Sequence, residues 1–197
     1  MAKTGLEFGA SKAVIVMAAL GSFGCGSTPT EILGDTNQFF LFEVEYASSW
    51  FPTWTGVAID RDGNVVRYRR EETPWSPVDD SSITKAELEA KYAADATQIA
   101  TIDSATVAQR FASIAGVGQD FAEPNLACAD AGLLRYTAFA FDEATHRYRS
   151  LLLRAEGDFP TQNKSDAARE LAAWLRTVLE QHPVDGLRPF DEGTCTP

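Results

Sequence analysis

The chain has 197 residues, of which 45% are hydrophobic, with 17 Lys+Arg against 28 Asp+Glu and a formal net charge of −11. This is enough apolar material for one compact domain, and the charge argues against a nucleic-acid-binding protein because phosphate binding requires clustered positive charge. The composition also excludes collagen-like, disulfide-dense and broadly disordered chains.

The N-terminal segment has the organisation of a signal peptide. Lys3 and Lys12 make its beginning net positive, and residues 13–24 carry no charge. The strongly apolar part, residues 13–20, is too short to span a bilayer comfortably but has the length of the apolar region of a signal peptide. The segment is therefore predicted to direct export.

The residues Ser22-Phe23-Gly24-Cys25 follow this apolar stretch. The arrangement resembles the signal peptide of bacterial lipoproteins, in which a small residue precedes a cysteine that receives lipid, and the signal is removed just before that cysteine. The resemblance implies a signal peptide over residues 1–24, a lipidated Cys25 and a location in the cell envelope, at the periplasmic face or in the outer membrane. An ordinary secretory signal, an uncleaved anchor and a cytoplasmic chain are the alternatives.

Two further cysteines, Cys128 and Cys195, remain in the exported chain. An even pair in an oxidising compartment is expected to form a disulfide. Closing a loop of this size would constrain the unfolded chain by roughly 4 kcal/mol. The alternative is that both are unrelated buried thiols.

The residues after Cys25 divide into a tether and a domain. Residues 26–37 are rich in Gly, Ser, Thr and Pro without sustained periodicity, so residues 25–37 are predicted to be the lipidated cysteine with a flexible tether. Residues 38–197 are predicted to form a single domain. Loss of residues 1–24 changes the net charge to −12, so membrane attachment would come from the lipid rather than from the protein surface.

The first half of the domain has the pattern of an antiparallel meander. Residues 38–47 alternate between apolar and other residues, and strands are also expected at 56–60 and 64–70. Between the last two strands, Asp60-Arg61-Asp62-Gly63 is a strong signal for a tight turn.

Helices are predicted where capping residues precede an apolar stripe. Thr84-Lys85-Ala86-Glu87 matches a capping box, and Asp103 or Ser104 can begin a second helix. Further along the chain, strands are expected at 133–141 and 147–155. Ser165 can then cap a helix that continues to about residue 181.

These elements together predict an α+β domain. We expect an antiparallel sheet of about five strands, formed by two hairpin regions that are each followed by helix, with the helices packed on one face. Arg67-Tyr68-Arg69 and Arg147-Tyr148-Arg149 occupy equivalent places after the two turns, which leaves an old duplication open.

Four arginines in these strands form one candidate site. Alternation places them on the face opposite Tyr68 and Tyr148, and they are Arg67, Arg69, Arg147 and Arg149. They are either a basic strip for an anionic ligand or cross-strand partners of Glu43 and Glu45 on an exposed sheet face.

An aromatic loop forms a second candidate site. Trp50, Phe51 and Trp54 surround Pro52, and flat aromatic faces can stack on sugars or dock a protein partner with little loss of entropy. The alternative is that these side chains cover the end of a small core. We regard this loop as the best candidate binding surface in the chain.

Signals for catalysis or cofactor binding are weak. The loop carboxylates Asp130 and Asp158, with Asn163, are the candidates for acid–base chemistry, although such residues are also common in turns. The oxygen-bearing residues from Asp60 to Glu71 have part of the spacing of a calcium loop, but the glycine is misplaced. The chain contains no GxSxG, HExxH or phosphate-binding Gly-rich loop, and we expect no cofactor and no metal.

The sequence therefore favours a lipid-anchored protein of the cell envelope that acts as a non-enzymatic binding or scaffolding module for a protein or glycan. It resembles the many envelope lipoproteins that carry one compact domain. The alternatives are an envelope hydrolase that uses loop carboxylates, and an inhibitor or immunity-like partner of another envelope protein.

Overall fold

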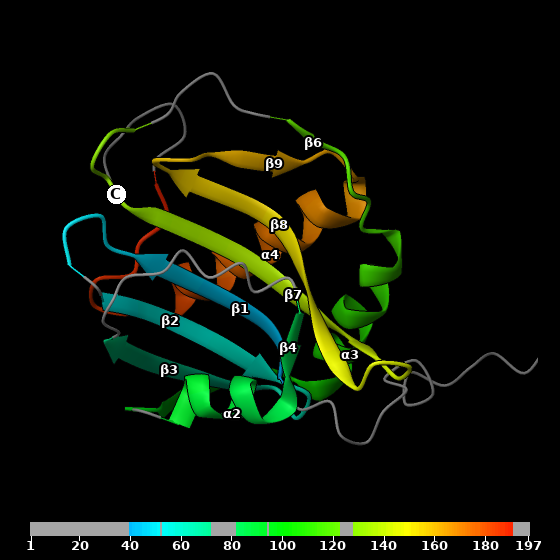
Figure 1. Cartoon of the computed structure of the whole chain (residues 1–197). Coiled ribbons are helices and arrows are strands. Elements are labelled where there is room, and N and C mark those ends of the chain that lie inside the picture. Colours follow the sequence, from blue (N-terminus) through cyan, green and yellow to red (C-terminus); the bar gives the residue numbers. More distant parts are fainter. Residues whose placement is uncertain (1–39, 52, 72–81, 94, 123–127, 191–197) are drawn as a thin grey trace, which may run out of the picture.

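The computed structural model describes residues 40–51, 53–71, 82–93, 95–122 and 128–190. They form one curved antiparallel sheet with helices on both faces, with α2 in front of the sheet and α4 behind it in Figure 1. The strands are β1 (Phe40–Ala47), β2 (Thr53–Asp60), β3 (Asn64–Glu71), β4 (Ser82–Thr84), β5 (Thr97–Thr101), β6 (Phe121–Ala122), β7 (Leu133–Asp142), β8 (Arg147–Gly157) and β9 (Thr161–Asn163). The helices are α2 (Lys85–Ala93), α3 (Ser104–Ala112), the 3-10 helix η1 (Ser113–Gly116) and α4 (Asp166–Gln181).

Two strands far apart in the sequence, β1 and β7, pair at the centre of the sheet. In the described part of the chain its nine strands follow the order β5-β3-β2-β1-β7-β8-β9-β6, and β4 pairs with the first part of β8. The central strands β1 and β7 are antiparallel, with Ala47 opposite Leu133. On the other side of β7, Gly157 of β8 also lies opposite Leu133. The end of β1, the beginning of β7 and the end of β8 therefore meet at one end of the sheet.

The turn between β2 and β3 is closed by the side chain of Asp60. Its carboxylate accepts hydrogen bonds from the backbone N–H groups of Asp62 and Asn64, at 2.9 and 2.8 Å, and from the Asn64 amide. This is the local bonding that favours Asp and Asn in tight turns. The Asp60 carboxylate, the first oxygen ligand of the suggested calcium loop, is thus engaged by the turn itself.

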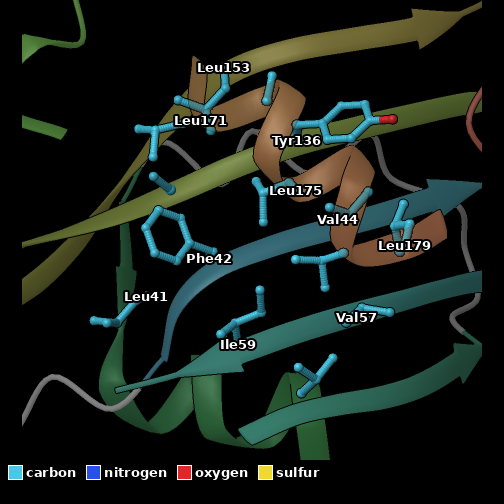
Figure 2. Close-up of a cluster of buried hydrophobic side chains, with 14 of the residues drawn as sticks. Leu41, Phe42, Val44, Val57, Ile59, Tyr136, Leu153, Leu171, Leu175 and Leu179 are labelled. Carbon is cyan, nitrogen blue, oxygen red and sulfur yellow. The ribbon is translucent and has the colours of Figure 1, made fainter. Parts of the chain in front are cut away.

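The larger hydrophobic core lies between the sheet and helices α3 and α4. Ser165 caps α4 by accepting a hydrogen bond from the Ala168 N–H, and the apolar stripe of the helix faces the sheet. Figure 2 shows Leu171, Leu175 and Leu179 of α4 among side chains of the central strands, such as Val44. Helical spacing and strand alternation place these side chains between the two layers.

A second core lies on the opposite face, under α2. The expected capping box is present, because the Thr84 N–H donates to Glu87 at 2.7 Å and the Glu87 N–H donates to the Thr84 hydroxyl at 3.2 Å. Leu88 and Tyr92 of α2 are buried against a set of mostly aromatic side chains from the sheet, which are Phe40, Ala58, Tyr68, Ile83, Phe139 and Tyr148.

The predicted fold class is wrong in two respects. The sheet has nine strands among the described residues instead of about five, and the helices cover both of its faces instead of one. The additional strands include β4, β6 and β9, which have two or three residues each and are too short to show a period in the sequence. Helices were expected on one face only because Glu43 and Glu45 make the other face, which α2 covers, look solvent-exposed in the sequence.

Candidate binding surface at one end of the sheet

The aromatic loop projects from the end of the sheet where β1, β7 and β8 meet. In Figure 1 this is the cyan connection between β1 and β2, beside the arrowhead of β8. The backbone of the loop is folded on itself, since the Ser48 N–H donates to the Thr53 carbonyl at 3.2 Å. The Ser48 hydroxyl also accepts hydrogen bonds from the N–H groups of Trp50 and Phe51, each at 3.3 Å.

A second turn, between β8 and β9, supports this loop. The hydroxyl of Ser49 donates to the carboxylate of Asp158, and the other oxygen of Asp158 accepts from the Ala131 N–H at 2.8 Å. The Tyr46 hydroxyl donates to the Ala131 carbonyl at 2.9 Å. Asp158 thus links three segments that are far apart in the sequence, and the loop is positioned by side-chain hydrogen bonds.

Three aromatic side chains at this end are exposed. Trp50 is 70% exposed, Phe51 67% and Phe159, which follows Asp158, 73%. We call Trp50, Phe51 and Phe159 the aromatic tip. Large apolar side chains that remain in water on an ordered scaffold are characteristic of interaction sites, because the same area would otherwise be buried at a gain of free energy.

Trp54 does not belong to this surface. It is 3% exposed, and the guanidinium of Arg70 lies over its ring at 4.6 Å from the ring centroid. The alternative that aromatic side chains of this loop cover the end of the core is correct for Trp54. Trp54 closes the end of the core, whereas Trp50 and Phe51 extend beyond it.

The four candidate arginines do not form one strip. Arg67 and Arg69 lie on β3 and Arg147 and Arg149 on β8, and three strands separate β3 from β8. Four strand spacings amount to about 19 Å. Arg69 pairs with Glu71 at 3.4 Å, and Arg147 donates to the hydroxyl and the carbonyl of Ser82 and lies 3.7 Å from Glu87.

Glu43 and Glu45 are buried and have different partners from those expected. Lys91 of α2 lies 2.8 Å from Glu43 and 3.4 Å from Glu45, and Arg70 bonds Glu45 at 3.2 Å. The hydroxyl of Tyr68 lies within hydrogen-bond distance of both carboxylates and can donate its one proton to either of them. We call Glu43, Glu45, Tyr68, Arg70 and Lys91 the buried ionic cluster. It links β1 and β3 to the helix that covers them.

The cluster separates the pKa values of its two carboxyl groups. Burial raises the pKa of Glu43 above its ordinary value, because the single cation Lys91 does not offset the loss of water and the repulsion from Glu45. Burial acts on Glu45 too, but Lys91 and Arg70 together hold its pKa below the ordinary value. Burial and both carboxylates raise the pKa of Tyr68, which keeps its hydroxyl protonated.

Two of the three loop residues considered for acid–base chemistry, Asp158 and Asn163, have structural partners. Asp158 holds the loop as described, and Asp130 lies in a turn with φ = 63°. Asn163 is buried, donates to the carbonyls of Gly118 and Leu152, and accepts from Ser165. The geometry thus gives Asp158 and Asn163 positioning roles. Within the described ranges, no group of three or more His, Cys, Asp or Glu side chains is arranged to hold a metal ion.

Cys128 and the segment that follows α4 come together near Gly157. The buried Cys128 donates its N–H to the Gly157 carbonyl at 3.1 Å. Phe190 packs against Gly157, donates its N–H to Glu156 at 3.0 Å and accepts from Arg176 at 3.1 Å. Cys195 lies outside the described residues, as do the predicted signal peptide, Cys25 and the tether.

Comparison of the chain with protein-family models, with curated proteins and with solved structures found no match. Among the described residues, no helix is both long and apolar enough to cross a membrane.

Two features of this end of the sheet escaped the sequence analysis. The exposure of Phe159 could have been predicted, since an aromatic residue between Asp158 and Pro160 in a predicted turn has few neighbours against which it can be buried. The hydrogen bond from Ser49 to Asp158 could not have been predicted from a local pattern, because it joins residues 109 positions apart.

Proposed function

We propose that the protein is a lipid-anchored module of the bacterial cell envelope that binds a partner through its aromatic tip. The observation that carries the binding role is the exposure of Trp50 and Phe51 on a loop fixed by Ser48 and by the contact from Ser49 to Asp158. A side chain held in place before binding loses less entropy when the partner arrives, so an ordered aromatic surface is suited to recognition.

The anchoring role rests on the likeness of the N-terminal segment to a lipoprotein signal peptide. Fifteen residues from Cys25 to residue 39 span at most about 50 Å when extended. The described chain enters the sheet at Phe40, at the opposite end of β1 from the aromatic tip, and eight strand residues cover about 27 Å. Because the anchor and the aromatic tip lie at opposite ends of β1, the aromatic tip would be directed away from the membrane.

A disulfide between Cys128 and Cys195 is part of the proposal. Cys128 and Phe190 both contact Gly157, and Cys195 follows Phe190 by only five positions. Five residues reach up to about 17 Å, which is ample for a bridge that requires Cα atoms about 5.5–6 Å apart. Such a bridge would attach the C-terminal tail to the same end of the sheet as the aromatic tip.

The binding role is tested by removing the tip without unfolding the protein. The double variant Trp50→Ala/Phe51→Ala is expected to change the free energy of unfolding by less than about 0.5 kcal/mol per site, because both side chains are exposed. In cells, a photo-crosslinking phenylalanine analogue at position 51 is expected to give a membrane-bound adduct that decreases when Trp50 is also replaced by Ala.

Phe121 provides the matched control. It is 41% exposed on β6, so the same analogue at position 121 tests an aromatic site outside the tip. Adducts of equal yield at positions 51 and 121, or adducts from position 51 that do not depend on Trp50, would contradict a binding role for the tip. Chemical denaturation of each purified variant separates lost binding from lost folding.

A further inference from the structure

The environment of Trp50 differs from that of the other described tryptophans. The guanidinium of Arg70 lies over the ring of Trp54 at 4.6 Å, and that of Arg110 lies over Trp174 at 5.8 Å. In the part of the chain that the structure describes, Trp50 has no ring contact and no cation over its face, and it is 70% exposed. Its indole face is therefore open to a ligand.

The polar groups beside the tip are acidic. Asp158 accepts one hydrogen bond from Ser49 and one from Ala131, whereas a carboxylate offers about four acceptor positions. Asp130, which directly precedes Ala131, is exposed in its turn. Carboxylates beside an open indole provide the two features that bind a planar cation, which are an acceptor for its N–H groups and a π face for its plane.

We infer that the aromatic tip binds a cationic segment of a protein partner, with an arginine side chain stacked on Trp50 and bonded to Asp158 or Asp130. Phe51 and Phe159 would contact apolar residues that flank this arginine. The inference rests on the proposed binding function and specifies its partner. The net charge of −11 supports it, because a basic partner is attracted over a longer range than the contact itself.

Charge also distinguishes a cationic protein partner from the other molecules that could bind the aromatic tip. A second copy of the chain carries the same negative charge and is repelled, as is a surface of anionic lipid. A neutral glycan could stack on the same rings and donate hydroxyl groups to the carboxylates, but because it carries no charge its affinity would be nearly independent of salt. The response to charge therefore identifies the class of partner.

The test uses a synthetic peptide in which three arginines alternate with leucines, and a second peptide with citrulline, which is neutral and of the same shape, in place of each arginine. We expect the full chain to bind the arginine peptide at least tenfold more tightly, measured by tryptophan fluorescence or NMR titration at low salt. Trp50→Ala should weaken this binding about fivefold.

Two further variants keep the test specific. Asp130→Asn removes a carboxylate but retains a residue that tolerates a left-handed backbone, so it should weaken arginine binding without unfolding the turn. Phe121→Ala should leave the affinity unchanged. Equal affinity for the arginine and citrulline peptides, or undiminished arginine binding in the Trp50 variant, would overturn the inference. If crosslinking from position 51 still depended on Trp50, the binding function would stand and only the cationic partner would be rejected.

Discussion

Replacement of Lys91 by methionine is expected to lower the free energy of unfolding by about 3–5 kcal/mol at pH 7. Lys91 contacts both Glu43 and Glu45 in a region from which water is excluded. Methionine keeps the length of the side chain but removes the cation, so two buried carboxylates would share Arg70 alone. Urea denaturation of the purified variant measures the change.

The matched control is Lys85→Met on the same helix. Lys85 lies at the surface, 3.8 Å from Glu89, so its removal should cost about 0.5 kcal/mol or less. The additional change Glu43→Gln should restore part of the stability lost in the Lys91 variant, because it removes one of the two uncompensated charges. Similar losses from the Lys85 and Lys91 variants would show that the buried ionic cluster contributes little to holding α2.

The cost of losing Lys91 should also depend on pH. The folded pKa of Glu45 lies below its ordinary value of 4.5, so its ionised form stabilises the protein above that value, and this contribution is lost as the pH falls through the lower folded pKa. Protonated carboxyls do not require the lysine. Without Lys91 both buried carboxyl groups would protonate at a higher pH, so the difference in stability between the Lys91 variant and the wild type should narrow as the pH falls from 7 towards the folded pKa of Glu45.

Gly157→Ala is expected to destabilise the protein by about 2–5 kcal/mol. Gly157 has φ = 101°, a conformation that residues with a Cβ rarely adopt, and an added Cβ would overlap the carbonyl oxygen of Gly132. The same position contacts Cys128 and Phe190, so the strain would fall at the support of the aromatic tip and the C-terminal segment. Thermal and urea denaturation would measure it.

Gly186 provides a control that separates the cost of a positive φ from the cost of the steric overlap with Gly132. It also has a positive φ, of 78°, but an added Cβ would meet nothing within 4 Å. Gly186→Ala should therefore cost only about 1–2 kcal/mol, the backbone penalty alone. If the two variants were equally stable, the close approach of the β7 and β8 ends at Gly157 would be contradicted.

The sequence predicted the elements whose signals are local. The turn at Asp60, the capping box at Thr84 and the cap at Ser165 depend on residues within a few positions, and each has the expected hydrogen bonds. The hydrophobic stripe of α4 likewise faces the sheet, because helical spacing alone determines which side chains share a face.

The features that could not be predicted from the sequence depend on contacts between residues that are far apart along the chain. Glu43 and Glu45 alternate with apolar residues and therefore look solvent-exposed, but Lys91, 48 residues from Glu43, makes their burial tolerable. Trp50 and Trp54 look equivalent in the sequence. They differ because Trp54 lies in β2 opposite Arg70, whereas Trp50 lies in the loop before it.

The most direct test of the proposed function is the intact mass of the native protein recovered from membranes, followed by mapping of its disulfides. The proposal predicts a chain that begins at Cys25, carries acyl groups on that residue and contains one bridge between Cys128 and Cys195. A chain recovered at full length from the cytosol, with its initiator methionine, no acyl groups and free thiols at both positions, would contradict the anchor, the compartment and the bridge together.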